Sequence, residues 1–179
     1  MSRFRVDGML HREGEAMTTS NQGSAEQANL TGTVSVQRVC TSTPEQVWEV
    51  LADGWAFSSW VVGASRMRAV EPDWPAVGSK LHHSIGTWPA VLDDETQVRE
   101  VDPGRRLVLR ARTRPVGEQT VEITVAPHAD GGSLITMRED AAKGPARLVP
   151  RPARQAGLAA RNRETLRRLC LLAERRPAP

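Results

Sequence analysis

Cysteine and most aromatic residues are scarce in this sequence. Its 179 residues include two cysteines, two phenylalanines and no tyrosine. Cys40 and Cys170 are far apart in the chain and lack the CxxC spacing of metal and redox sites, and two cysteines also disfavour a disulfide framework. We therefore expect Cys40 and Cys170 to be buried thiols.

Long apolar runs and signature motifs are also missing. No segment approaches the roughly 20 apolar residues that span a bilayer, and the N-terminal stretch lacks the apolar core of a secretory signal. The sequence contains no Gly-rich phosphate loop, HExxH motif, EF-hand pattern or GxSxG elbow. We expect a soluble chain without a membrane span, with the cytoplasm as its default location, and neither a metal nor a cofactor.

Length and composition indicate one folded domain behind a polar tail. A chain of 179 residues is large enough for one domain with a core or an enclosed cavity. Residues 1–30 mix charges with Ser, Thr, Asn, Gln and Gly, and hold too few large apolar residues to bury a face. We expect a disordered tail over 1–30, a folded domain over 31–175 and a short tail over 176–179. Whether Met1 or Met17 starts the natural chain is left open.

The first part of the domain predicts a strand and two short helices. Residues 31–41 alternate in the manner of a partly buried strand. In TPEQVWEVLAD, Thr43 suits an N-cap, a proline follows it, and Gln46 completes a capping-box pattern. Asp53 and Gly54 end this helix, and WAFSSWV predicts a second short one.

The rest of the domain predicts six strands and a long helix. The strand patterns cover 65–71, 79–88, 96–102, 105–113, 119–127 and 133–140, with turn residues between them. We expect the acidic run Asp93 to Glu95 to be a solvated turn. Residues 154–175 return to helical spacing, with a leucine-rich stripe opposite Arg161 and other arginines. This order, without βαβ alternation, predicts an α+β domain with helices on one face of a curved antiparallel sheet.

Three stretches of the chain resemble a known family. TPEQVWEVLAD followed by WAFSSWVVGA is similar to its opening helix pair, and EVDPGRRLVLRAR is similar to its strand-turn-strand in mid-sheet. The closing helix ending LRRLCLLAERR lies in the expected place. The family is the START-like (SRPBCC) superfamily of polyketide cyclases/dehydrases and lipid-transport proteins, and the resemblance covers residues 31–175. It implies a helix-grip fold: a curved seven-stranded antiparallel sheet with two short helices and a long C-terminal helix over an apolar cavity.

The resemblance implies a function in that cavity without deciding its kind. The first reading is binding of a small hydrophobic ligand, for transport or sequestration. The alternative is an aromatase/cyclase-like or related enzyme that acts on a ligand in the same cavity. Because the family has no universal catalytic motif, no catalytic role is carried over to a residue of this chain.

The basic C-terminal part raises the question of a charged partner. Residues 138–179 carry 11 Lys or Arg against 4 acidic residues, although the formal net charge of the chain is only +3. The arginines lack interleaved aromatic residues and no helix-turn-helix pattern precedes them, so nucleic acid is not expected as a partner. The expected partner is a small hydrophobic molecule, and a homodimer is left open.

The apolar alternation of the strands predicts which side chains line the cavity. If this face points inward, the lining includes Leu81, His83, Ile85, Leu107, Leu109, Ala111, Val121, Ile123, Val125, Ile135, Met137 and Glu139. For Trp60 and Trp88 ligand contact and simple packing are both open, since tryptophan serves either use. The residues expected to contact a ligand are Trp60, Leu81, His83, Ile85, Trp88, Leu109, Ile123, Ile135, Met137 and Glu139.

His83 and Glu139 are the polar members of this lining and therefore the catalytic candidates. Adjacent strand residues point to opposite faces, so His82 and His83 cannot both bind one metal ion, and only His83 faces inward. Apolar surroundings would shift the protonation of His83 and Glu139. Two interpretations stay open: either the pair orients a ligand or moves its protons, or both are structural residues in contact with solvent or salt-bridge partners.

Overall fold

The computed structural model describes residues 33–113, 117–140 and 150–177. The predicted tail over residues 1–30 lies outside the described residues. The strands are β1 (Thr33–Cys40), β2 (Ala64–Val70), β3 (Lys80–Thr87), β4 (Ala90–Asp102), β5 (Arg106–Thr113), β6 (Gly117–Pro127) and β7 (Ser133–Asp140). The helices are α2 (Pro44–Ala52), the 3₁₀ helix η1 (Gly54–Ala56), α3 (Phe57–Trp60) and α4 (Arg151–Ala173). This order confirms the predicted strand, short helices, six strands and long helix.

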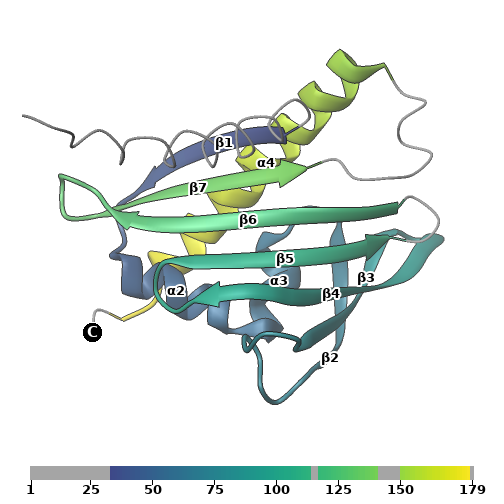
Figure 1. The fold of residues 1–179 in the computed structure, drawn as a ribbon, viewed down its shortest axis with the longest axis horizontal. Helices are drawn as coiled ribbons and strands as arrows, with labels where there is room; N and C mark the ends of the chain where they lie inside the picture. The colour runs from purple at the N-terminus through teal and green to yellow at the C-terminus, as the bar shows by residue number, and fades with distance from the viewer. Residues whose placement is uncertain (1–32, 114–116, 141–149, 178–179) are drawn as a thin grey trace, which may run out of the picture. The chain divides into compact units, whose positions relative to one another are not determined.

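The seven strands form one antiparallel sheet in the order β1-β7-β6-β5-β4-β3-β2. All consecutive strands from β2 to β7 are neighbours, and β1 closes the edge by pairing with β7. Figure 1 shows that the helices lie on one side of this curved sheet, with α4 running diagonally behind it. The predicted helix-grip architecture is confirmed. Among the described residues, no helix is both long and apolar enough to cross a bilayer.

The start of α2 follows the predicted capping box. The Gln46 backbone N–H donates to Thr43 Oγ1 at 3.4 Å, and the Thr43 N–H donates to Gln46 Oε1 at 3.0 Å. These two bonds satisfy donors that a helix start leaves without partners. The apolar face of α2 is buried, and α3 then buries Phe57 and Trp60 beside the sheet. Capping and burial together hold α2 and α3 in place, and α3 borders the cavity described below.

The expected turn over Asp93 to Glu95 is wrong, because all three acids lie inside β4. The chain reverses earlier, at Trp88 and Pro89, where Thr87 pairs with Ala90. The resulting register pairs His83 with Asp94, so both side chains belong to the inner face of the sheet. Consecutive acids look like a solvated turn in the sequence, but strand alternation buries Asp94 and directs its two neighbours outward.

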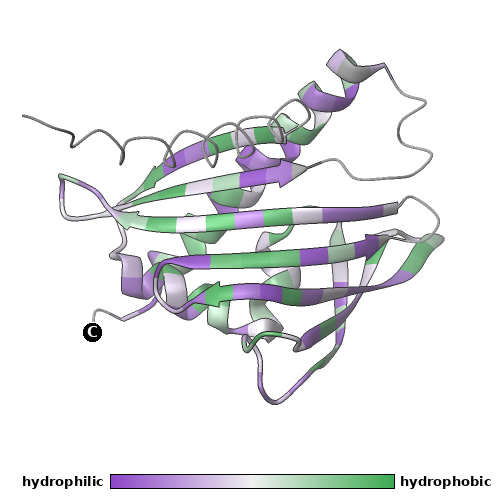
Figure 2. Cartoon of the chain, viewed as in Figure 1, coloured by the Kyte–Doolittle hydropathy of each residue, from purple (hydrophilic) through white to green (hydrophobic). Residues whose placement is uncertain are grey.

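The core lies between the inner face of the sheet and the helices. Figure 2 shows hydrophobic and hydrophilic residues alternating along the strands. Leu166, Leu169 and Ala173 of α4 are fully buried and join β-strand residues in one cluster. Cys40 and Cys170 are free and buried, as predicted. This cluster packs one part of the sheet tightly and leaves another part open to a cavity.

Candidate functional site: a cavity between the sheet and the helices

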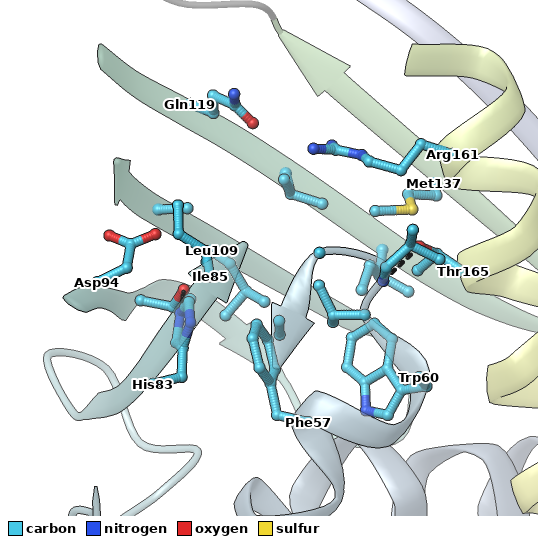
Figure 3. A pocket seen from close by; sticks show the side chains of 18 of the residues that line it. Phe57, Trp60, His83, Ile85, Asp94, Leu109, Gln119, Met137, Arg161 and Thr165 are labelled. Atoms are coloured by element: carbon cyan, nitrogen blue, oxygen red, sulfur yellow. Dashed lines mark hydrogen bonds between the residues drawn. The ribbon is translucent and has the colours of Figure 1, made fainter. Parts of the chain in front are cut away.

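A cavity of about 300 Å³ lies between the inner face of the sheet and helices α3 and α4. This volume is at the lower end of the range that small-molecule sites occupy, roughly 300 to 1,000 Å³. Figure 3 shows Phe57 and Trp60 on one side and Arg161 on another. The lining residues are Phe57, Trp60, Val61, Val62, Gly63, Ala64, His83, Ile85, Gly86, Asp94, Thr96, Leu109, Ala111, Gln119, Val121, Ile123, Met137, Arg161 and Thr165.

Most of the side chains expected to contact a ligand do line the cavity. They are Trp60, His83, Ile85, Leu109, Ile123 and Met137. All except Trp60 occupy inward positions of strands, which is why the alternation found them. Trp60 is in α3. Their contact with a ligand remains a prediction.

Leu81 and Ile135 are not in the cavity lining, although both point inward. A Cβ atom added at Gly54 would lie 2.8 Å from Leu81 Cδ2, so η1 packs directly on this leucine. Ile135 is fully buried in the hydrophobic core cluster. Inward direction therefore identified the correct face of the strands but not which part of that face a helix covers.

Trp88 also lies outside the cavity lining. It sits at the turn between β3 and β4, and 88% of its surface is exposed. Its expected contact with a ligand in this cavity is not supported, because a residue at the tip of a two-residue hairpin extends beyond the paired strands. Trp60 is the tryptophan that borders the cavity.

His83 is buried at one side of the cavity. Its Nε2 lies 2.9 Å from Thr96 Oγ1, and its ring lies 5.0 Å from the Phe57 ring, centroid to centroid. Burial lowers the pKa of His83 to about 4, and the nearby charges of Arg68 and His82 act in the same direction. The imidazole is therefore neutral at pH 7. His82 points to the other face and lies 3.8 Å from Glu71, as the alternation predicted.

Glu139 is fully buried, yet it lies behind the cavity wall rather than in it. Arg161 Nη2 donates to both carboxylate oxygens, and Asn162 Nδ2 donates to Oε2 at 2.7 Å. His83 is on β3 and Glu139 on β7, with three strands between them. The two candidates therefore do not form one acid-base pair, and each has its own local partners.

Arg161 is a cavity residue that the sequence pattern assigned to the solvated face of the last helix. That assignment is wrong, because Arg161 lines the cavity (Figure 3) and pairs with Glu139. The signal was present in the spacing: Arg161 lies three residues after Leu158 and four before Thr165, which puts all three on one helix face. Because Arg161 is charged, the sequence pattern indicated the solvent-facing side of the helix instead.

Four further polar side chains in the lining were not predicted. They are Asp94, Thr96, Gln119 and Thr165. Thr165 Oγ1 accepts a hydrogen bond from the Val62 N–H at 3.2 Å and so ties the loop after α3 to α4. Among the residues that the structure describes, no group of three or more His, Cys, Asp or Glu side chains is arranged to hold a metal ion.

A family described as polyketide cyclase/dehydrase and lipid transport matches residues 31–174 of the chain. No curated protein matches this chain. The matched range covers both the cavity and the core described above. It is also close to the range of the resemblance seen in the sequence.

Solved structures share the fold at low sequence identity. Protein CV1439 from Chromobacterium violaceum is 19% identical with a TM-score of 0.61, covering 80% of this chain and 99% of that one. The di-domain ARO/CYC StfQ from the steffimycin biosynthetic pathway is 14% identical with a TM-score of 0.62, covering 83% of this chain and 53% of that one. Ara h 8.0201 is 10% identical with a TM-score of 0.59, covering 80% of this chain and 98% of that one.

Proposed function

Since the chain belongs to the polyketide cyclase/dehydrase and lipid-transport family, we propose that it binds a small hydrophobic ligand in the cavity between the sheet and α4. The observation that carries the proposal is the cavity itself. Its wall is mostly apolar, with one group of polar residues around His83 and another around Arg161. This combination is typical of sites that bury a ligand and orient it through a small number of polar contacts.

The state of His83 and Glu139 favours binding over acid-base catalysis. An efficient general base has a pKa near the working pH, whereas burial lowers the pKa of His83 to about 4. The Glu139 carboxylate is engaged by Arg161 and Asn162 behind the wall. Neither residue is therefore arranged for proton transfer at neutral pH.

An aromatase/cyclase-like enzyme is the second candidate function. One observation favours it: His83, Thr96 and Asp94 lie together on one wall, where they could position a reactive carbonyl compound. Holding a flexible substrate in a reactive geometry supplies much of the acceleration in an intramolecular reaction. This candidate would be favoured if the protein forms a product from a flexible carbonyl compound and a His83→Gln variant does not.

Native mass spectrometry of the purified protein tests the binding proposal. We expect a retained apolar molecule that solvent extraction releases and identifies. A fluorescence titration then locates it: Trp60→Phe removes the indole that borders the cavity, whereas Trp55→Phe removes an exposed one. The ligand-dependent change should disappear only in Trp60→Phe. An empty protein whose fluorescence responds to no apolar compound would contradict the proposal.

A further inference from the structure

Arg161 lines the cavity, and the described residues engage only two of its three side-chain nitrogens. Its Nη2 binds Glu139, and its Nε donates to Asn162 Oδ1 at 3.3 Å. Within residues 33–113, 117–140 and 150–177, no group accepts a hydrogen bond from Nη1. The Arg161 side chain is 34% exposed and lines the cavity, whereas Glu139 is 0% exposed. Glu139 and Asn162 therefore fix the guanidinium on the side away from the cavity, and Nη1 can donate a hydrogen bond to a ligand.

The pair with Glu139 also determines what kind of ligand group this edge suits. The buried carboxylate balances the guanidinium charge, so Arg161 offers N–H donors without a net positive charge at that place. His83, also in the lining, is neutral at pH 7. A ligand carboxylate would bring a second negative charge to a guanidinium whose charge Glu139 already balances. An uncharged oxygen acceptor meets no such opposition.

Gln119 lies on the same side of the cavity as Arg161. Its amide is part of the lining and is drawn in Figure 3 at the upper edge with the guanidinium, away from His83 and Phe57. An amide N–H₂ is a second uncharged donor. The aromatic and aliphatic side chains Phe57, Trp60 and Leu109 are among the apolar residues of the wall. Arg161 and Gln119 thus place N–H donors at one side of the cavity, and apolar side chains are within reach across it.

From this arrangement we infer the class of ligand, an inference that rests on the proposed binding function. The ligand is a compact apolar molecule, or an apolar end of a larger one, that carries an uncharged oxygen acceptor such as a ketone carbonyl. The oxygen accepts hydrogen bonds from Arg161 Nη1 and the Gln119 amide. The apolar body packs against Phe57, Trp60 and Leu109. A carboxylate of the same shape binds more weakly.

Three probes of nearly equal shape test this inference. They are 2-acetylnaphthalene with a ketone, 2-naphthoate with a carboxylate and 2-isopropylnaphthalene with neither, and equilibrium dialysis measures the binding of each. For the unaltered protein we expect the ketone to bind about tenfold more tightly than the hydrocarbon, since a hydrogen bond from a charged donor contributes about this much. We expect the naphthoate to bind more weakly than the ketone.

Variants of the Arg161–Glu139 pair should change the relative affinities of the three probes in different ways. Glu139→Gln leaves the guanidinium charge unbalanced, so the order should change and naphthoate should gain about tenfold relative to the ketone. The double variant Arg161→Met with Glu139→Gln removes both charges together, and the ketone should lose its advantage over the hydrocarbon. Arg163→Met, on an exposed position of α4, is the matched control and should behave as the unaltered protein. Circular dichroism verifies that each variant is folded.

The outcomes separate failure of this inference from failure of the proposed function. If all three probes bind equally and the double variant changes nothing, the cavity binds apolar ligands but the assigned ligand class is wrong. If naphthoate binds most tightly to the unaltered protein, the site is an anion site and the inference is overturned. If none of the three binds, the cavity does not hold small apolar molecules, and the proposed function falls with the inference.

Discussion

The inner face of the sheet has a closed part and an open part, and both are built from the same strands. In the closed part, Leu81, Leu107 and Ile135 are fully buried in the core cluster. In the open part, Ile85 and Ala111, four residues further along β3 and β5, line the cavity. The strand pattern is the same in both parts. What differs is whether a helix packs directly on the strands, as η1 does at Gly54.

The largest difference between the two parts should appear in the cost of truncating a leucine. Leu107→Ala in the closed part should lower the free energy of unfolding by about 3 to 4 kcal/mol, because it leaves a cavity among tightly packed atoms. Leu109→Ala removes the same atoms, but Leu109 already borders empty space, so we expect about half that cost. Urea denaturation measures both values, and equal losses would mean that the open part is packed as tightly as the closed one.

The open part contains His83, which should make the free energy of unfolding depend on pH. The pKa of His83 is lowered from 6.5 to about 4, so the unfolded chain binds more protons than the folded one between these values. The free energy of unfolding is therefore unaffected by the protonation of His83 above pH 6.5. It decreases as the pH falls toward 4, by about 3 kcal/mol at most, because protonation of His83 favours the unfolded chain.

A His83→Gln variant isolates this contribution. The difference in unfolding free energy between the unaltered protein and this variant should change with pH between 6.5 and 4. His82→Gln, on the outer face, is the control and should leave the pH dependence in place. A pH dependence that survives in His83→Gln would show that His83 does not cause it.

A somewhat smaller effect is expected from the charged pair behind the cavity wall. Arg161→Met leaves the fully buried Glu139 carboxylate without its cation and should cost about 2 to 3 kcal/mol, less than a wholly buried pair because Arg161 is about one third exposed. Adding Glu139→Gln to this variant should restore most of the loss, since no unpaired charge remains. Urea denaturation at pH 7 measures both variants. A loss that the second substitution does not relieve would mean that packing, rather than charge, makes Arg161 important.

The fold could be predicted from local signals that do not depend on tertiary structure. Thr43 and Gln46 form a capping box through neighbouring backbone groups, and the alternation around His83 separates it from His82 in any strand. Sequence alternation also directed Ile85 and Met137 inward. These signals hold because each is decided by backbone geometry within a few residues.

The cavity could be predicted only in part, because its boundary depends on packing between distant elements. Leu81 is covered by η1, and nothing in the pattern of β3 shows this. Arg161 and Asp94 face inward despite their charge, since helix and strand spacing place them on the inner face. Because both side chains are charged, the sequence indicated that both would face solvent. The pairing of Arg161 with Glu139, 22 residues earlier in the chain, became visible only in the folded structure.

The binding of 2-isopropylnaphthalene to a cavity-filling variant tests most directly whether the open part is the ligand site. Ala111→Phe places a large side chain in the cavity, whereas Ala126→Phe places the same side chain at an exposed position of β6. In equilibrium dialysis, Ala111→Phe should lose at least about tenfold in affinity, and Ala126→Phe should bind as the unaltered protein does. If Ala111→Phe folds and still binds the probe with unchanged affinity, the ligand site lies elsewhere.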